Sequence, residues 1–307
     1  MRVYILSGYL MTFIMNRNYG YTVRGIKTYV LNRFLRIFPP YWFVCAITLF
    51  CLIFAPAYFA DMHPSLRFPK TTHEILSNLF IFGLSFEVPM ARLSPPAWAL
   101  HVELCFYVLI GLFLGRYKLL VTLWLALSVG YHIVALIYDM PRYAPVSAAS
   151  LPFSLGAFLY HNKDRIAGLI PASARITVAS LSLFCVFALT AELIPVKTNV
   201  IPFYINIAFS FILIHQLSTI DRKAFPSLKK IDAFLGDLSY PIYLSHWLIA
   251  AGLSAVFHLQ KSLLLFAILI PCVLLFSIIM KVVVDDPIER KRRAIAASLQ
   301  DTARGAG

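Results

Sequence analysis

Charged residues are scarce in this chain of 307 residues. Only 13% of its residues are Asp, Glu, Lys or Arg, and 60% are hydrophobic. Soluble domains carry about 25% charged residues, and long apolar runs recur here from one end of the sequence to the other. A soluble globular domain is therefore excluded. We expect an all-α fold, a polytopic transmembrane helical bundle, because a helix satisfies its own backbone hydrogen bonds inside a bilayer.

Acidic residues are particularly few, with 14 Asp and Glu against 27 Lys and Arg, which gives a formal net charge of +13. Such an excess of positive charge could indicate nucleic-acid binding. However, no basic block stands apart from the apolar runs, so we expect no nucleic-acid partner. The excess is better explained by cytoplasmic loops, which are rich in Lys and Arg in membrane proteins.

Motifs for metal or nucleotide chemistry are absent from the sequence. The five cysteines lie in apolar runs, with no metal-ligand spacing and no pattern of paired loop cysteines. No G-x-S-x-G elbow, Walker A loop or H-E-x-x-H helix occurs. We therefore expect no bound metal and no permanently bound cofactor.

The apolar runs predict about nine membrane spans. If residues 16–36 are cytoplasmic, 20 of the 27 lysines and arginines fall on the cytoplasmic side, together with the C-terminus. Residues 60–96 would then be external. We expect a membrane-embedded domain over residues 1–285 and a basic cytoplasmic tail over residues 286–307. The predicted spans are Val3–Met15, Ile37–Phe59, Ala97–Gly115, Leu119–Tyr138, Ser147–Tyr160, Ile176–Ile194, Val200–Ile220, Leu238–His258 and Leu263–Val284.

One carboxylate stands out inside an apolar run. Pro95 and Pro96 mark a helix start, Trp98 suits a membrane–water interface, and Glu103 follows among apolar residues. A carboxylate at membrane depth is costly, which favours a functional role. Tyr107, four residues after Glu103, shares its helix face. The alternative is a structural carboxylate bonded to another helix.

This segment resembles the signature of the acyltransferase 3 family, W-S-L-x-x-E-x-x-F-Y. Trp98, Glu103, Phe106 and Tyr107 match this pattern, whereas Ala99 replaces the usual serine. Three further segments also resemble family motifs, in the family's order. The family is expected to have ten spans, and the nine predicted here resemble its second to tenth.

Two of these segments lie near the N-terminus. Ser7 and Gly8 match the core of the family's second helix, and small residues there permit close helix contact. Arg33 and Arg36 match an R-x-x-R motif that precedes the third helix. Two guanidinium groups on one face could bind phosphate bidentately. The alternative is that these arginines only fix the topology of the chain.

The third segment, LSYPIYLSHW, is similar to the family's L-S-Y-x-x-Y-L-x-H motif. Ser239, Tyr243 and His246 fall at i, i+4 and i+7, on one helical face. Such a polar stripe can line a cavity, where His246 could carry a proton or orient a substrate. The alternative is a histidine with a purely structural hydrogen bond.

The resemblance implies transfer of an acyl group, most simply acetyl, from acyl-CoA to a hydroxyl of a glycan or lipid-linked acceptor. It implies an enzyme in the inner membrane of a bacterium, in contact with the lipid bilayer. A proton-coupled multi-pass transporter is the alternative function; it would favour an inverted repeat, and none is evident in the sequence. The candidate site comprises Glu103 and His246 as catalytic residues, Arg33 and Arg36 for the donor, and Ser7, Trp98, Tyr107, Ser239 and Tyr243 for the substrate.

The first apolar run is short. It has 13 residues, Val3–Met15, where a span needs about 20. The resemblance places the family's principal catalytic histidine in a preceding first helix, ten residues after an arginine. We therefore expect an upstream segment that supplies both residues, and no acyl transfer by the 307 residues alone.

Overall fold

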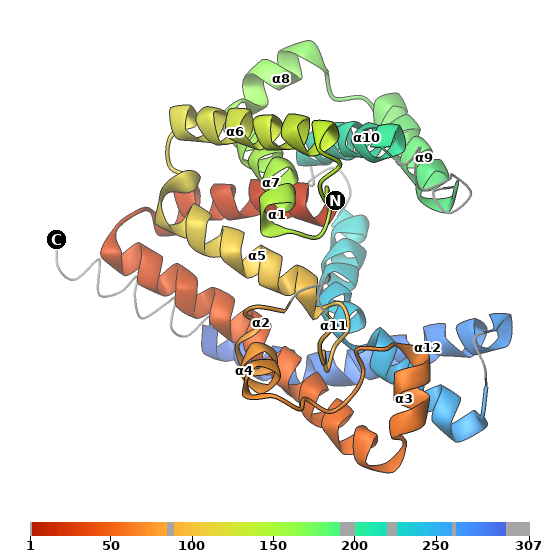
Figure 1. Cartoon of the computed structure of the whole chain (residues 1–307). Coiled ribbons are helices and arrows are strands. Elements are labelled where there is room, and N and C mark those ends of the chain that lie inside the picture. Colours follow the sequence, from red (N-terminus) through yellow and green to blue (C-terminus); the bar gives the residue numbers. More distant parts are fainter. Residues whose placement is uncertain (1, 85–88, 191–199, 220–225, 260–261, 293–307) are drawn as a thin grey trace. The chain divides into compact units, whose positions relative to one another are not determined.

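Every element that the structure describes is a helix. The computed structural model describes residues 2–84, 89–190, 200–219, 226–259 and 262–292 (Figure 1). The predicted all-α class is confirmed. Of the predicted tail, residues 293–307 lie outside the described part. The elements are α1 (Arg2–Ile14), η1 (Met15–Tyr19), α2 (Val23–Phe54), α3 (Pro56–Met62), α4 (Thr72–Phe80), α5 (Ala97–Leu109), η2 (Ile110–Leu114), α6 (Lys118–Ile137), α7 (Val146–His161), α8 (Lys163–Leu169), α9 (Ala174–Thr190), α10 (Val200–Thr219), α11 (Pro226–Phe257), α12 (Leu263–Met280) and η5 (Lys281–Asp285).

The polytopic membrane character is also confirmed. Among the described residues, six helices are long and apolar enough to cross a membrane, or up to seven if the bent pair of α8 and α9 forms one span. The helices α1 and α7, with 13 and 16 residues, are shorter than the roughly 20 residues that a span needs. The six are Val23–Phe54, Ala97–Leu114, Lys118–Ile137, Val200–Thr219, Ile231–Phe257 and Leu263–Arg292.

The chain forms two compact units. Unit 1 comprises Met1–Tyr29 and Val102–Ala224, and unit 2 comprises Val30–His101 and Phe225–Gly307. Both units draw on segments that are distant in sequence. Long-range packing, rather than a linker, therefore defines them.

In unit 1, α1 and α7 pack closely through two glycines. A Cβ atom added to Gly8 would collide with the backbone of Phe153, and one added to Gly156 would collide with the backbone around Ile5. The prediction that Gly8 permits close helix contact is thus confirmed. The ring of Phe106 on α5 stacks on Phe153, with ring centroids 4.4 Å apart, so α5 joins the same core.

The helix α2 starts at Val23, earlier than the predicted span, and from Val30 onwards it belongs to unit 2. It continues through Pro39 and Pro40, which lie in its interior. Likewise, Pro241 lies inside α11. A proline lacks one N–H and disturbs one helical turn, but packing of the flanking residues can outweigh this cost.

The segment between α2 and α5 folds back along the helices of unit 2. The indole Nε1 of Trp42 donates to the Leu79 carbonyl oxygen over 2.8 Å, which places the end of α4 beside the middle of α2 (Figure 1). Trp42 lies about 18 Å from the end of α2 at Phe54, at about 1.5 Å per residue. Ser94 Oγ donates to the Leu244 carbonyl oxygen on α11 over 3.0 Å. The segment therefore packs beside the spans instead of projecting from them.

Candidate functional site

A hydrogen-bonded group of three predicted site residues lies in unit 1. The Tyr107 hydroxyl donates to Glu103 Oε2 over 2.8 Å, and the Tyr107 Oη atom lies 3.4 Å from Ser7 Oγ. Ser7 and Tyr107 are both 8% exposed, and Glu103 is partly buried. The Tyr107 hydroxyl has a single proton, and it donates this proton in the hydrogen bond to the Glu103 carboxylate. The Ser7 hydroxyl can therefore act as the donor in the contact between Ser7 and Tyr107.

This group depends on how α5 is held. The spacing of four residues places Glu103 and Tyr107 on one face, as predicted. The Tyr29 hydroxyl on α2 donates to the Tyr107 carbonyl oxygen over 3.2 Å. Ser7 comes from α1, one hundred residues away in the chain. Side chains from α1, α2 and α5 thus take part in this hydrogen-bonded group and its support.

The predicted stripe on α11 divides in the structure. The Tyr243 hydroxyl donates to the Pro96 carbonyl oxygen, at the start of α5. His246 Nδ1 donates to the Ile242 carbonyl oxygen over 3.1 Å, so a neutral imidazole keeps its lone pair on Nε2. Ser239 is exposed and its hydroxyl donates to the Gly236 carbonyl oxygen. Tyr243 and His246 are therefore the partly buried members of the stripe.

Trp98, another predicted substrate residue, lies on α5 with Glu103 and Tyr107. Trp98 is partly buried in the first turn of α5. Glu103 belongs to unit 1 and His246 to unit 2.

A charged cleft surrounds one of the two predicted arginines in unit 2. Its volume is about 280 Å³, and Arg36 lines it whereas Arg33 does not. Lys281 Nζ lies 2.7 Å from Asp286 Oδ1 and 3.7 Å from Asp237 Oδ2, so it joins the two acidic residues across the cleft. The full lining is Leu35, Arg36, Asp237, Tyr240, Lys281, Asp285, Asp286, Ile288, Glu289 and Arg292.

Two buried histidines have structural hydrogen bonds. Both ring nitrogens of His132 are bonded, to the Tyr204 hydroxyl and to the Ala148 carbonyl oxygen, each over 2.9 Å. His215 Nε2 donates to the Ile170 carbonyl oxygen over 2.8 Å. Neighbouring segments therefore satisfy both ring nitrogens of His132, whereas Nδ1 of His215 is buried without a hydrogen-bond partner among the residues that the structure describes.

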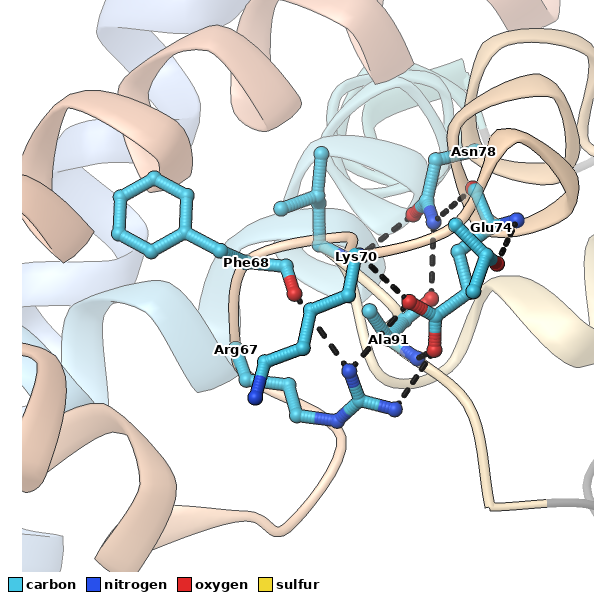
Figure 2. A network of polar contacts seen from close by, with 8 residues as sticks. Arg67, Phe68, Lys70, Glu74, Asn78 and Ala91 are labelled. Carbon is cyan, nitrogen blue, oxygen red and sulfur yellow. Dashed lines mark hydrogen bonds and ion pairs between the residues drawn. The ribbon is translucent and has the colours of Figure 1, made fainter.

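Sequence reasoning did not single out the network around Glu74 in unit 2 (Figure 2). The Arg67 guanidinium donates to both carboxylate oxygens, over 2.6 and 3.3 Å. The N–H groups of Lys70 and Ala91 donate to it over 2.7 and 2.8 Å. Asn78 extends the network, since its amide donates to the Ala91 carbonyl oxygen and its Oδ1 accepts from the N–H of Leu93.

The network holds Glu74 as a carboxylate. Burial alone would raise the pKa of Glu74, but the N–H groups of Lys70 and Ala91 and the Arg67 guanidinium outweigh it and lower the pKa to about 2. Thr71 caps α4 by accepting from the N–H of Glu74. The T-x-x-E spacing of a capping box was a sequence signal for this helix start. The Glu74 carboxylate itself accepts from the loop N–H groups of Lys70 and Ala91.

The helical spans and the carboxylate within an apolar helix define an integral membrane protein with polar chemistry inside its bundle. A family model described as an acyltransferase domain matches residues 4–282. The chain belongs to the acyltransferase 3 family. No curated protein and no solved structure matches the chain.

Proposed function

We propose that this membrane acyltransferase moves an acetyl group from acyl-CoA to a hydroxyl of a glycan or lipid-linked acceptor. We place it in the inner membrane of a bacterium, with its C-terminus in the cytoplasm. The observation that carries the proposal is the bonded group of Glu103, Tyr107 and Ser7, which lies within the family match. A partly buried carboxylate that is held by a hydrogen bond inside an apolar helix is suited to proton transfer.

The reaction needs a base, an acceptor oxygen and a leaving thiolate. The acceptor O–H bond breaks as its proton passes to a base, and the oxygen forms a bond to the thioester carbonyl carbon. The C–S bond then breaks, and the CoA sulfur takes up a proton. Glu103, oriented by Tyr107, is our candidate base, and the Nε2 lone pair of His246 is the second basic group. Cationic groups near Arg36 would bind the phosphates of the donor.

The test is transfer of radiolabelled acetyl from acetyl-CoA in membranes, with release of free CoA measured in parallel. The chain is assayed as 307 residues and together with any in-frame upstream residues. Glu103→Gln keeps shape and most hydrogen bonds but removes the basic group, so we expect a loss of about 100-fold or more. Normal transfer by a well-expressed Glu103→Gln protein would contradict the role of Glu103. Absence of labelled product from every form would contradict the proposed reaction.

A further inference from the structure

The charge balance of the cleft around Arg36 is unusual for a phosphate site. The cleft is lined by three cations and four carboxylates, although the chain as a whole has a net charge of +13. Phosphate groups bind where positive charge is in excess. In the structure, carboxylates therefore already neutralise most of the positive charge of the cleft. The cations are Arg36, Lys281 and Arg292, and the carboxylates are Asp237, Asp285, Asp286 and Glu289.

The three cations differ in their partners. Lys281 contacts Asp286 and Asp237, and its side chain is only 19% exposed. Arg292 pairs with Glu289 through Nη1 at 2.5 Å and also reaches Asn32 through Nε. Arg36 is exposed and has no carboxylate oxygen within 4 Å among the residues that the structure describes. Arg36 is therefore the cation best placed to meet an incoming anion.

One guanidinium is insufficient for a diphosphate, which carries two adjacent anionic groups. Arg33 lies three residues from Arg36 but does not line the cleft. Lys281, from η5, lines the same cleft as Arg36 on α2. Its ammonium group can exchange ligands without backbone change, because it is a point charge on a flexible stem.

We propose that Lys281 is the second phosphate-binding cation of the donor site, and that Asp286 and Asp237 hold it until the donor arrives. The inference rests on the proposed acyl-CoA donor. Donor phosphate replaces the Asp286 carboxylate at the ammonium group, so Lys281 passes from one anionic partner to another. It is never left buried and unpaired, which would be strongly unfavourable. Asp286 is 40% exposed and can be solvated after release.

This exchange has a measurable consequence: the carboxylates compete with the donor. Asp286→Asn removes the closer competitor, so coenzyme A should bind about threefold more tightly. Lys281→Gln removes one charge-assisted contact, and should weaken binding about tenfold. In the Lys281→Gln background, Asp286→Asn should give no gain, because the two residues act through one contact.

The experiment is a calorimetric titration of the purified chain in lipid nanodiscs with coenzyme A. Asp232→Asn is the acidic control: Asp232 is exposed on α11 and does not line the cleft. Arg290→Gln is the basic control, since Arg290 is exposed and also outside the lining. Neither control should change the affinity by more than about twofold, the size expected of a screened surface charge.

The outcomes separate this inference from the proposed function. One outcome is that wild type binds coenzyme A and that Arg36→Gln weakens this binding, whereas Lys281→Gln does not. That outcome would support the proposed donor and overturn the role of Lys281. Equal tightening by Asp286→Asn and Asp232→Asn would also overturn it, since only general surface charge would be acting. If wild type binds no coenzyme A, the proposed donor itself fails.

Discussion

The hydroxyl of Tyr107 lies 2.8 Å from Oε2 of Glu103, one helical turn away on α5. This hydrogen bond fixes the direction of a carboxylate that stands in an apolar span. A carboxylate with a fixed direction is suited to accept a proton from one position.

Tyr107→Phe removes this bond and keeps the aromatic ring. We expect transfer to fall at least tenfold while the protein unfolds only slightly more easily, by about 1 kcal/mol, the usual worth of one hydrogen bond. Tyr29→Phe is the matched control, because the Tyr29 hydroxyl bonds the backbone of Tyr107 and not Glu103. Equal activities of the two variants would show that the Tyr107 hydroxyl has no special role.

Gly8→Ala should strongly destabilise unit 1. The added methyl group would overlap the backbone of Phe153, and a backbone atom yields less readily than a flexible side chain. We expect a loss of about 2 kcal/mol or more, measured by thermal unfolding in detergent. At Gly130 on α6 a Cβ atom would meet nothing within 4 Å, so Gly130→Ala should be neutral or slightly stabilising. A similar response of both variants would contradict the close packing of α1 and α7.

Glu74→Gln should remove a pH-dependent contribution to stability. The folded pKa of about 2 lies below the ordinary value of 4.5, so the stabilisation is complete above pH 4.5 and is lost as the pH falls from 4.5 towards 2. The shift corresponds to a contribution on the order of 3 kcal/mol at neutral pH. Thermal unfolding should show a clearly larger difference between wild type and variant at pH 7 than at pH 3.

The control for this prediction is Asp139→Asn. Asp139 pairs with Arg142, but its side chain is 91% exposed. An exposed ion pair contributes little to stability. This variant should therefore follow the wild type at both pH values, and a loss as large as that of Glu74→Gln would show that the assay responds to any lost carboxylate.

The topology predicted from charge can be tested by cysteine labelling. In a background without native cysteines, a cysteine at position 70 should react with an impermeant maleimide added outside intact cells. A cysteine at position 291 should react only after the membrane is opened. Both Lys70 and Lys291 are exposed, so neither position is shielded by the protein itself. Reversed labelling would overturn the assignment of residues 16–36 to the cytoplasm.

The sequence by itself determined the class of this protein. The chain has too few charged residues and too many apolar runs for a fold that is soluble in water, because water solvates charged groups but not long apolar segments. The order of four motif-like segments indicated the family that the match over residues 4–282 then established. The spacing of Glu103 and Tyr107 also fixed their common face, because residues four apart are neighbours on any α-helix.

Only the tertiary structure decided which distant residues meet. Ser7 joins Tyr107 across one hundred residues, and Arg36, but not Arg33, shares a cleft with Lys281. The register of one helix against another follows from details such as Gly8 against Phe153, which no local pattern encodes. The Glu74 network depends likewise on a loop returning to α4, because its hydrogen-bond donors are backbone groups that every residue but proline carries.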